Sequence, residues 1–219
     1  ILALIGPNGA GKSTCFNMLG GQIRPQRGSI RLAGQELAGL APHRIWKLGV
    51  ARTFQVSAAF RSMNVRENVQ MALLAHHGGA ASVLRLATGA HVEEALSLLE
   101  QVGLADQAGR ACAELAYGDV KRLELAIALA GSPRVLLLDE PTAGMSARER
   151  MAMMTLVDRL VGERGIAALF TEHDMDAVFR FAQRILVMSR GRLIAEGTPE
   201  AIRANEQVRA IYLGRSHGR

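Results

Sequence analysis

The chain of 219 residues lacks several features that would point away from an intracellular enzyme. It has two cysteines, Cys15 and Cys112, and no Cys-x-x-Cys or Cys/His cluster, which argues for a reducing, cytosolic setting and against structural zinc. No apolar run approaches the roughly 18 residues that a membrane-spanning helix needs, and no signal peptide is visible. Repeats and low-complexity tracts are also absent. One compact catalytic unit with a smaller subdomain is therefore expected.

Aromatic residues are scarce at 4% of the chain, with one Trp and two Tyr, so few side chains could stack on nucleobases. The net charge is +6 and comes mainly from scattered arginines, not from a dense basic run. A nucleic-acid partner, a membrane surface or no specific target could each explain this balance. We favour the last, with some attraction to an anionic inner leaflet, and we expect no nucleic-acid partner.

The most informative stretch is a phosphate-binding loop at residues 6–14, Gly-Pro-Asn-Gly-Ala-Gly-Lys-Ser-Thr, which matches G-x-x-x-x-G-K-[ST]. It lies between an apolar run, residues 1–5, predicted to be a buried strand, and a predicted helix that starts with residues 15–19. The glycines let backbone N–H groups point at a phosphate beside the positive end of the helix. A glycine-rich turn without a ligand is the alternative, and the complete strand–loop–helix arrangement argues against it.

Within this loop, Lys12 is expected to reach the β- and γ-phosphates, and the Ser13 hydroxyl is expected to ligate Mg²⁺. Further nucleotide contacts are expected from Gly6, Asn8, Gly9, Ala10, Gly11 and Thr14. The loop by itself indicates only that a nucleoside triphosphate binds, because kinases, GTPases and motor ATPases share it.

Two acidic residues follow a second predicted strand. The apolar run of residues 135–138 is typical of a parallel strand covered on both faces, and Asp139 and Glu140 come directly after it. At the carboxyl edge of a parallel sheet they would lie beside the phosphate loop. Asp139 can hold Mg²⁺ through water, and Glu140 can orient and polarise the attacking water. A solvated acidic pair ending a core strand is the alternative.

His173 and Gln55 are candidates because of the strands that they follow. His173 follows the apolar run of residues 166–170, so it is expected at the same sheet edge, within reach of a γ-phosphate. The other histidines are taken as structural. Gln55 follows an extended stretch, and its amide can contact Mg²⁺ or the attacking water. A lone glutamine carries no functional weight, so its assignment depends on a family resemblance.

These motifs, in this order along nearly the whole chain, resemble the ATP-binding subunit of an ABC transporter. The matching segments are the phosphate loop at 6–14, the Q-loop at Gln55, the signature Leu-Ala-Tyr-Gly-Asp at 115–119, the Walker B strand at 136–140, the D-loop within 141–146 and the switch histidine at His173. The resemblance implies an α/β P-loop NTPase fold with a mainly parallel sheet core and a helical insertion, and it implies ATP hydrolysis with Mg²⁺.

Finer features are most similar to branched-chain amino acid importers. They are residues 51–55, Tyr117, residues 143–145 and residues 211–214. Importers of amides, urea and aromatic acids share them. The resemblance implies a second ATPase subunit bound head to tail, transmembrane permease subunits and, indirectly, an extracytoplasmic solute-binding protein. It also implies a peripheral location at the cytoplasmic face of the inner membrane. The residues Ala116, Tyr117, Gly118 and Asp119 would contact ATP held by the partner.

The chain departs from the family pattern at four places. Ala116 stands where the signature usually has Ser, and Asp119 stands where it has Gln; Tyr117 to Asp119 could otherwise be an ordinary capped turn. Ser146 replaces the usual Asp of the D-loop. The chain begins with Ile1 inside an expected core strand, whereas family members carry earlier strands and an aromatic residue that stacks on adenine. We therefore expect N-terminal strands to be missing.

Local signals predict how the chain is divided. One ABC ATPase domain is expected over residues 1–219, with a catalytic core at 1–55 and 120–198, a helical subdomain with the signature at 56–119 and a C-terminal helical tail at 199–219. Helix starts are predicted at Asn64, at about residue 147 and at Thr198, and a helix stop is predicted at Gly103.

Two rival functions come from other classes. A soluble ABC-type ATPase acting on DNA or ribosomes would need long coiled coils or two ATPase units, and the chain has neither sustained heptads nor a second unit. A regulatory nucleotide-binding module without turnover would not need Glu140 and His173. The favoured function is ATP hydrolysis that powers an importer.

Overall fold

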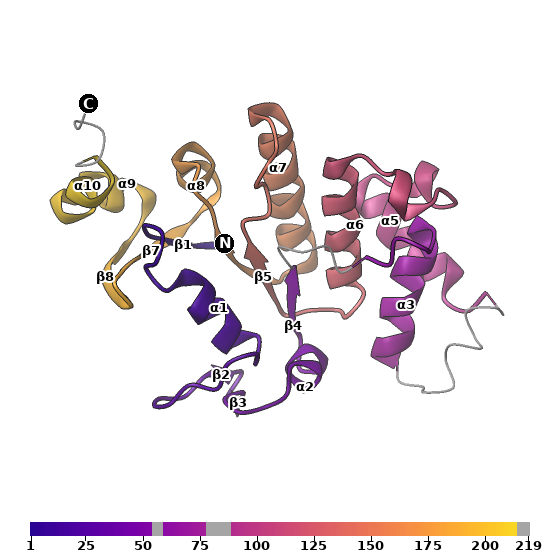
Figure 1. The fold of residues 1–219 in the computed structure, drawn as a ribbon, viewed down its shortest axis with the longest axis horizontal. Coiled ribbons are helices and arrows are strands. Elements are labelled where there is room, and N and C mark those ends of the chain that lie inside the picture. Colours follow the sequence, from indigo (N-terminus) through magenta and orange to yellow (C-terminus); the bar gives the residue numbers. More distant parts are fainter. Residues whose placement is uncertain (54–58, 78–88, 214–219) are drawn as a thin grey trace. The chain divides into compact units, whose positions relative to one another are not determined.

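The computed structural model describes residues 1–53, 59–77 and 89–213, and side chains up to residue 210. The chain forms two compact units (Figure 1). The first unit comprises Ile1–Pro42 and Leu137–Arg219, and the second unit comprises His43–Leu136. Residues 43–53 and 120–136, part of the catalytic core that the sequence predicts, thus cluster with the second unit, and the described tail residues 199–213 cluster with the first. The single-domain organisation stays a prediction.

A mainly parallel sheet organises the first unit, in which the strands lie in the order β5-β6-β1-β7-β8. β1 is parallel to β6 and to β7, and β8 runs antiparallel to β7. The strands are β1 (Leu2–Ile5), β5 (Val135–Asp139), β6 (Ala167–Thr171), β7 (Arg184–Ser189) and β8 (Arg192–Gly197). The carboxyl ends of β1, β5 and β6 meet at one sheet edge because parallel strands share their direction.

Helices cover both faces of this sheet. In Figure 1, α7 and α8 lie on one side of β1 and α1 lies on the other. The remaining elements of the first unit are α1 (Lys12–Leu19), the small hairpin β2 (Arg31–Leu32) and β3 (Gln35–Glu36), α7 (Ala147–Arg164), α8 (Met175–Phe181), α9 (Pro199–Ala204) and α10 (Glu206–Leu213). Double coverage explains why β1 and β5 are nearly continuous apolar runs. Ile5 of β1, Phe16 of α1 and Phe170 of β6 are fully buried in this unit.

Side-chain caps fix where several of these helices begin. The Ser146 hydroxyl accepts from the Glu149 N–H, and the Glu149 carboxylate accepts from the Ser146 N–H, which forms a capping box at the start of α7. The Thr198 hydroxyl caps α9 by accepting from the Ala201 N–H, directly before Pro199. Both predicted starts are confirmed. The Ser at position 146, a departure from the D-loop pattern, is therefore a helix cap here.

The second unit is built on three packed helices. Its elements are α2 (Pro42–Lys47), β4 (Val50–Thr53), α3 (Val65–His77), α5 (Val92–Val102), the 3-10 turns η2 (Ala105–Gln107) and η3 (Cys112–Glu114), and α6 (Tyr117–Leu129). The helices α3, α5 and α6 pack against one another, and each contributes a fully buried leucine: Leu73, Leu99 and Leu123, respectively. This packing explains why α6 clusters with the second unit.

The predicted helix start at Asn64 and the predicted helix stop at Gly103, both in the second unit, are also confirmed. The Asn64 side chain accepts from the Glu67 N–H at 2.8 Å, and the Glu67 carboxylate accepts from the Asn64 N–H at 2.8 Å, at the start of α3. Gly103 ends α5 in the left-handed conformation, with φ 73°.

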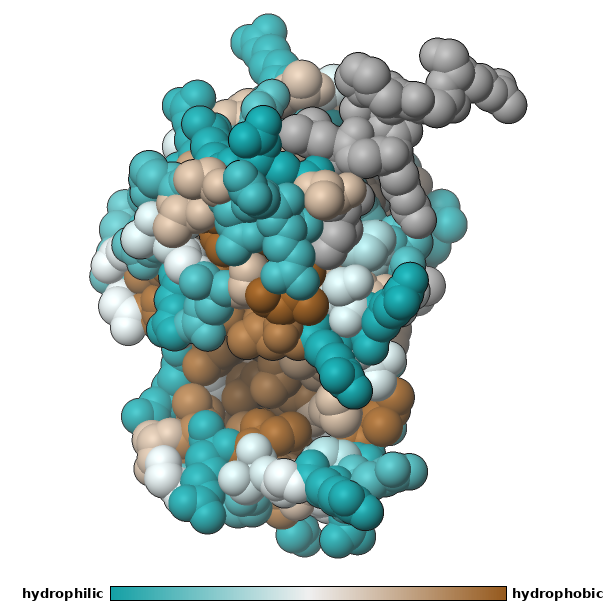
Figure 2. All heavy atoms as spheres, turned by 90° about the vertical axis from the view of Figure 1, so that its left-hand side faces the viewer, coloured by the Kyte–Doolittle hydropathy of each residue, from teal (hydrophilic) through white to brown (hydrophobic). Residues whose placement is uncertain are grey.

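One face of the molecule, the left-hand side of Figure 1, carries an apolar hollow. Figure 2 shows apolar side chains gathered there behind a polar rim. Leu193 of β8 has an exposed fraction of 53%. Among the residues that the structure describes, none of the helices is long and apolar enough to cross a membrane.

Candidate nucleotide-binding site

The phosphate loop joins β1 to α1 in the first unit. Gly11 precedes α1 with φ 101°, a left-handed conformation that favours glycine. Gly6 is required by a close approach, because a Cβ there would lie 2.3 Å from the Met188 carbonyl oxygen. The Gly191 N–H donates to the Ala10 carbonyl at 2.8 Å, which anchors the loop against the β7–β8 turn. The loop is thus held in place by the sheet beside it.

Lys12 is folded back onto this loop. Its Nζ donates to the Gly6 carbonyl at 2.6 Å and to the Pro7 carbonyl at 3.3 Å, and the residue is buried. Burial lowers the pKa of the Lys12 ammonium, while the nearby charges of Glu140 and Asp139 act to raise it. A buried cation whose hydrogen bonds go to carbonyl oxygens is suited to a more strongly anionic ligand such as a phosphate.

Asp139 ends β5, and β6 fixes its orientation. The Thr171 hydroxyl, at the end of β6, donates to the Asp139 carboxylate at 2.8 Å, and Asp139 is 5% exposed. The Glu140 N–H donates to the same hydroxyl at 3.0 Å and to the Thr171 carbonyl at 3.2 Å. Thr171 therefore ties the acidic pair to the next strand.

Glu140 and His173 face each other. The His173 Nε2 lies 2.9 Å from the Glu140 Oε1, with side chains 53% and 25% exposed respectively. Glu140 has φ 50°, a left-handed conformation that costs a non-glycine residue roughly 1–2 kcal/mol. The bonds from the Glu140 N–H to Thr171 and from the Ala143 N–H to the Glu140 carbonyl, at 3.1 Å, hold this conformation. The carboxylate is consequently aimed at His173.

Glu172 connects the two segments behind this pair. Its Oε1 accepts from the Thr142 N–H at 3.0 Å and from the Thr142 hydroxyl at 2.5 Å, and its Oε2 accepts from the His173 N–H at 3.3 Å. Glu172 and Thr142 are both buried. Sequence reasoning did not identify Glu172 or Thr142, since their roles depend on which strands lie side by side. The sequence feature that points to Glu172 is an acidic residue directly after an apolar strand and directly before His173.

Arg150 makes a second connection between the same segments. It forms an ion pair with Asp174, which caps α8 by accepting from the Ala177 N–H at 2.9 Å. Arg150 also donates to the Met145 carbonyl at 3.4 Å. The residues after Glu140 and those after His173 are therefore linked on two sides.

The signature lies in the second unit at the start of α6. Ala116 is the N-cap residue, with φ −62° and ψ 152°, and offers no side-chain hydrogen bond to the helix. Tyr117 is 54% exposed, and a Cβ on Gly118 would meet no atom within 4 Å. The Asp119 carboxylate accepts from the Gln107 amide at 3.0 Å. Asp119, expected to contact ATP held by the partner, thus already has a hydrogen-bond partner inside its own unit.

The structure brings Lys12, Asp139, Glu140 and His173 to one sheet edge of the first unit, with Ser13 and Thr14 exposed in the first turn of α1. Gln55 lies outside the described residues. A loop of inward N–H groups at a helix N-terminus fits phosphate, and the hydroxyl and carboxylate oxygens beside it fit Mg²⁺. This arrangement can bind a triphosphate and place a carboxylate and an imidazole beside an attacking water.

Comparison with known proteins places these motifs in a family. The sequence profile of the ABC transporter family matches residues 1–143, and a profile described as a branched-chain amino acid ATP-binding cassette transporter matches residues 192–218. The chain therefore belongs to the ABC transporter family, with the α/β fold of its ATPases. It is an ATP-binding protein of that family, an ATPase coupled to transport.

Individual relatives narrow the comparison. The chain is 41% identical over 224 residues to the high-affinity branched-chain amino acid transport ATP-binding protein LivG of Escherichia coli, covering 98% of this chain and 87% of that one. It is 39% identical to BraF of Pseudomonas aeruginosa, a protein of the same description, with the same coverage. It is also 34% identical to the lipopolysaccharide export ATP-binding protein LptB of Haemophilus influenzae, over 98% and 86% of the two chains.

Solved structures agree with the fold. An ATP-binding cassette of an ABC transporter in its ADP conformation matches with a TM-score of 0.85 and 28% identity, over 98% of this chain and 87% of that one. A nucleotide-free ATP-binding cassette matches with a TM-score of 0.83 and 26% identity, over 97% and 87%.

Proposed function

We propose that this chain binds and hydrolyses ATP to power an importer of branched-chain amino acids or related small polar solutes. The 39–41% identity to two proteins described as branched-chain amino acid transport ATP-binding proteins supports the solute class. The match of residues 192–218 to a profile of the same description supports it independently of the core motifs. The chain is also 34% identical, over 98% of its length, to a protein described as part of lipopolysaccharide export, so the shared nucleotide site does not itself select the solute.

The observation that carries the catalytic part is the pair formed by Glu140 Oε1 and His173 Nε2, 2.9 Å apart at the edge that also holds Lys12. In the proposed reaction the loop N–H groups and Lys12 hold the phosphates. Glu140 accepts a hydrogen bond from the attacking water, orients it in line with the γ-phosphate and takes up its proton. His173 positions Glu140 and donates toward the charge that develops on the γ-phosphate.

Mg²⁺ is expected at the same edge, where it would supply charge neutralisation to the phosphates. Ser13 and Asp139 would hold it, with Gln55 as a further ligand. The loop would make its further contacts to the phosphates through Gly6, Asn8, Gly9, Ala10, Gly11 and Thr14. Asp139 keeps its orientation in this proposal through the hydroxyl of Thr171.

We further propose that two such subunits act head to tail, with each ATP between one phosphate loop and the partner's signature. The exposed start of α6 is an anion-attracting helix N-terminus whose Ala116 adds no side-chain cap. Transmembrane permease subunits and, indirectly, an extracytoplasmic solute-binding protein complete the assembly. The chain would then lie on the cytoplasmic face of the inner membrane.

The decisive experiment replaces Glu140 by Gln in the complete protein with its permease and partner ATPase. The amide keeps the shape of the side chain but cannot take up a proton. We expect ATP binding to persist while single-turnover hydrolysis falls by about 10²–10⁴-fold. Glu163→Gln is the matched control, since Glu163 is an exposed acid of α7 that forms an ion pair with Arg159 at 3.5 Å. Equal hydrolysis in Glu140→Gln and Glu163→Gln would remove Glu140 from the mechanism.

The solute class needs a separate measurement. In membrane vesicles that contain the reconstituted importer, ATP-dependent uptake of labelled leucine should exceed uptake of a basic amino acid, and unlabelled isoleucine or valine should compete. ATP-driven uptake that ignores branched-chain amino acids would refute the solute class and leave the hydrolysis proposal standing.

A further inference from the structure

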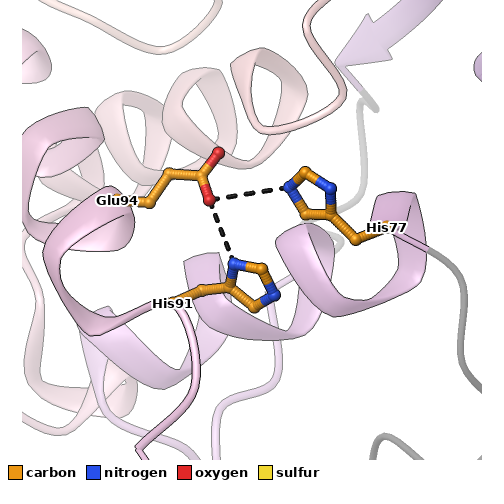
Figure 3. A group of neighbouring side chains, drawn as sticks. All are labelled: His77, His91 and Glu94. Carbon is orange, nitrogen blue, oxygen red and sulfur yellow. Dashed lines mark hydrogen bonds and ion pairs between the residues drawn. The ribbon is translucent and has the colours of Figure 1, made fainter.

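Three ligating side chains of the second unit converge between two helices. His77 is the last residue of α3, His91 precedes α5, and Glu94 lies in the first turn of α5. Figure 3 shows both imidazole rings turned toward one carboxylate oxygen. The Glu94 Oε2 lies 3.0 Å from the His91 Nδ1 and 3.6 Å from the His77 Nε2. We propose that these three residues form a binding site for a transition-metal dication, with Zn²⁺ as the best-suited ion.

The distances fit the edges of a small coordination polyhedron. Tetrahedral zinc bonds of about 2.0–2.2 Å place neighbouring ligand atoms roughly 3.3–3.5 Å apart. The two measured nitrogen–oxygen separations, 3.0 and 3.6 Å, bracket that value, and the three ligating atoms all lie within 4.8 Å of one another. Small side-chain rotations would bring all three atoms to bonding distance of one ion.

The rings must tilt for this to happen. The His77 and His91 rings are stacked, with centroids 4.7 Å apart and an interplanar angle of 4°. A metal ion lies in the plane of each imidazole that binds it, and two parallel planes share no such point. Because His77 and Glu94 are exposed and His91 is partly exposed, their torsions are free to open the stack. Metal binding should therefore replace the stacking of the two rings.

The surroundings hold the ligands near these positions. The ring of His76 packs edge-on against His77 and against Trp46, with centroids 5.4 Å apart in both pairs. The buried Gln70 of α3 donates to the Ala90 carbonyl at 2.6 Å, directly before His91. His91 itself has φ 60° and makes no side-chain cap bond to α5. The His91 ring is instead held beside the Glu94 carboxylate by their 3.0 Å contact, in the first turn of α5.

The ligand chemistry selects the class of ion. Two imidazole nitrogens and one carboxylate suit Zn²⁺ and its first-row neighbours, whereas Mg²⁺ prefers a shell of oxygens. The two cysteines and the lack of a Cys/His cluster in the sequence argue against structural zinc, and this proposal departs from that expectation because its ligands meet only in the fold and include no cysteine. Three protein ligands leave one position for water or for a group of a partner. The bound ion would tie the end of α3 to the start of α5.

The test uses the full chain without an affinity tag, because a histidine tag would bind the same ions. Zn²⁺ is titrated in competition with a chromophoric chelator, with millimolar Mg²⁺ present throughout, and Co²⁺ is added separately to report the coordination by its visible absorption. We expect one Zn²⁺ per chain and a tetrahedral Co²⁺ spectrum. His91→Gln and Glu94→Gln should each weaken binding by more than about tenfold.

His43→Gln is the matched control, because His43 is an exposed histidine of the second unit outside the cluster. It should bind Zn²⁺ like the parent. All three substituted side chains are at least partly exposed, so the variants should fold, and circular dichroism checks that they do. No stoichiometric binding, binding that Mg²⁺ abolishes, or equal affinity in His91→Gln, Glu94→Gln and His43→Gln would each overturn the proposal. None of these outcomes depends on ATP hydrolysis.

Discussion

Replacing Thr142 by Val tests the connection between the segments that carry Glu140 and His173. Thr142 is 1% exposed, and its N–H and hydroxyl both donate to the Glu172 Oε1, at 3.0 and 2.5 Å. Valine keeps the branched shape and removes only the hydroxyl. The buried Glu172 carboxylate would then keep the Thr142 and His173 N–H groups and lose its shortest bond.

The expected loss follows from that single bond. A hydrogen bond to a charged group contributes about 1.5–3 kcal/mol to the free energy of unfolding. For a chain of this size each kcal/mol lowers the unfolding midpoint by about 2–4 °C, so Thr142→Val should unfold roughly 3–12 °C earlier. Because Glu172 also holds the His173 N–H at 3.3 Å, kcat for ATP hydrolysis should fall more than KM for ATP rises.

A double-mutant cycle isolates the interaction. Thermal unfolding is measured for Thr142→Val, for Glu172→Gln and for the double variant. The loss of unfolding free energy in the double variant should be smaller than the sum of the two single losses by about 0.5–3 kcal/mol. Thr142→Ser is the control, since it keeps the hydroxyl and should retain kcat. Strict additivity of the two losses, or a Thr142→Ser variant as slow as Thr142→Val, would refute the reasoning.

Three further predictions concern nucleotide binding. Lys12→Ala should weaken ATP binding sharply in titrations with Mg²⁺, because the phosphates lose their buried cation; equal affinity would contradict the assignment of the loop. Burial lowers the pKa of Lys12 in the free protein and bound phosphate would raise it, so ATP binding should take up a proton between the two values. The affinity for ATP should therefore fall as the pH rises from the lower to the higher of these pKa values and stay constant below both. Calorimetry in buffers of different ionisation enthalpy measures the proton uptake, and Lys12→Ala should lose it. Ala116→Ser should strengthen ATP-driven dimerisation by about 0.5–3 kcal/mol in a background that cannot hydrolyse ATP, and a gain confined to ATP binding by the single subunit would contradict the head-to-tail arrangement. Thermal unfolding of the subunit is its control, since a serine at this N-cap can also stabilise α6 by about 0.5–2 kcal/mol.

The sequence by itself determined the features that are encoded within a few residues. The phosphate loop, the capping box of Asn64 and Glu67, the Thr198 cap and the Gly103 stop each depend on backbone groups three or four positions away, so their geometry follows from residue type and spacing. The apolar runs before the loop, before Asp139 and before His173 likewise predicted buried parallel strands. The family resemblance followed from the order of these local motifs.

Only the tertiary structure decided which of these segments meet and what holds them. Glu172 contacts Thr142 across 30 positions of the chain because β5 and β6 are neighbours, and no pattern near either residue encodes that neighbourhood. The assignment of α6 to the second unit depends on its packing against α3 and α5. The cluster of His77, His91 and Glu94 arises because the C-terminal end of α3 lies beside the N-terminal end of α5. Local signals fix backbone conformation, whereas strand order and helix packing are set by the summed burial of side chains that are distant in sequence.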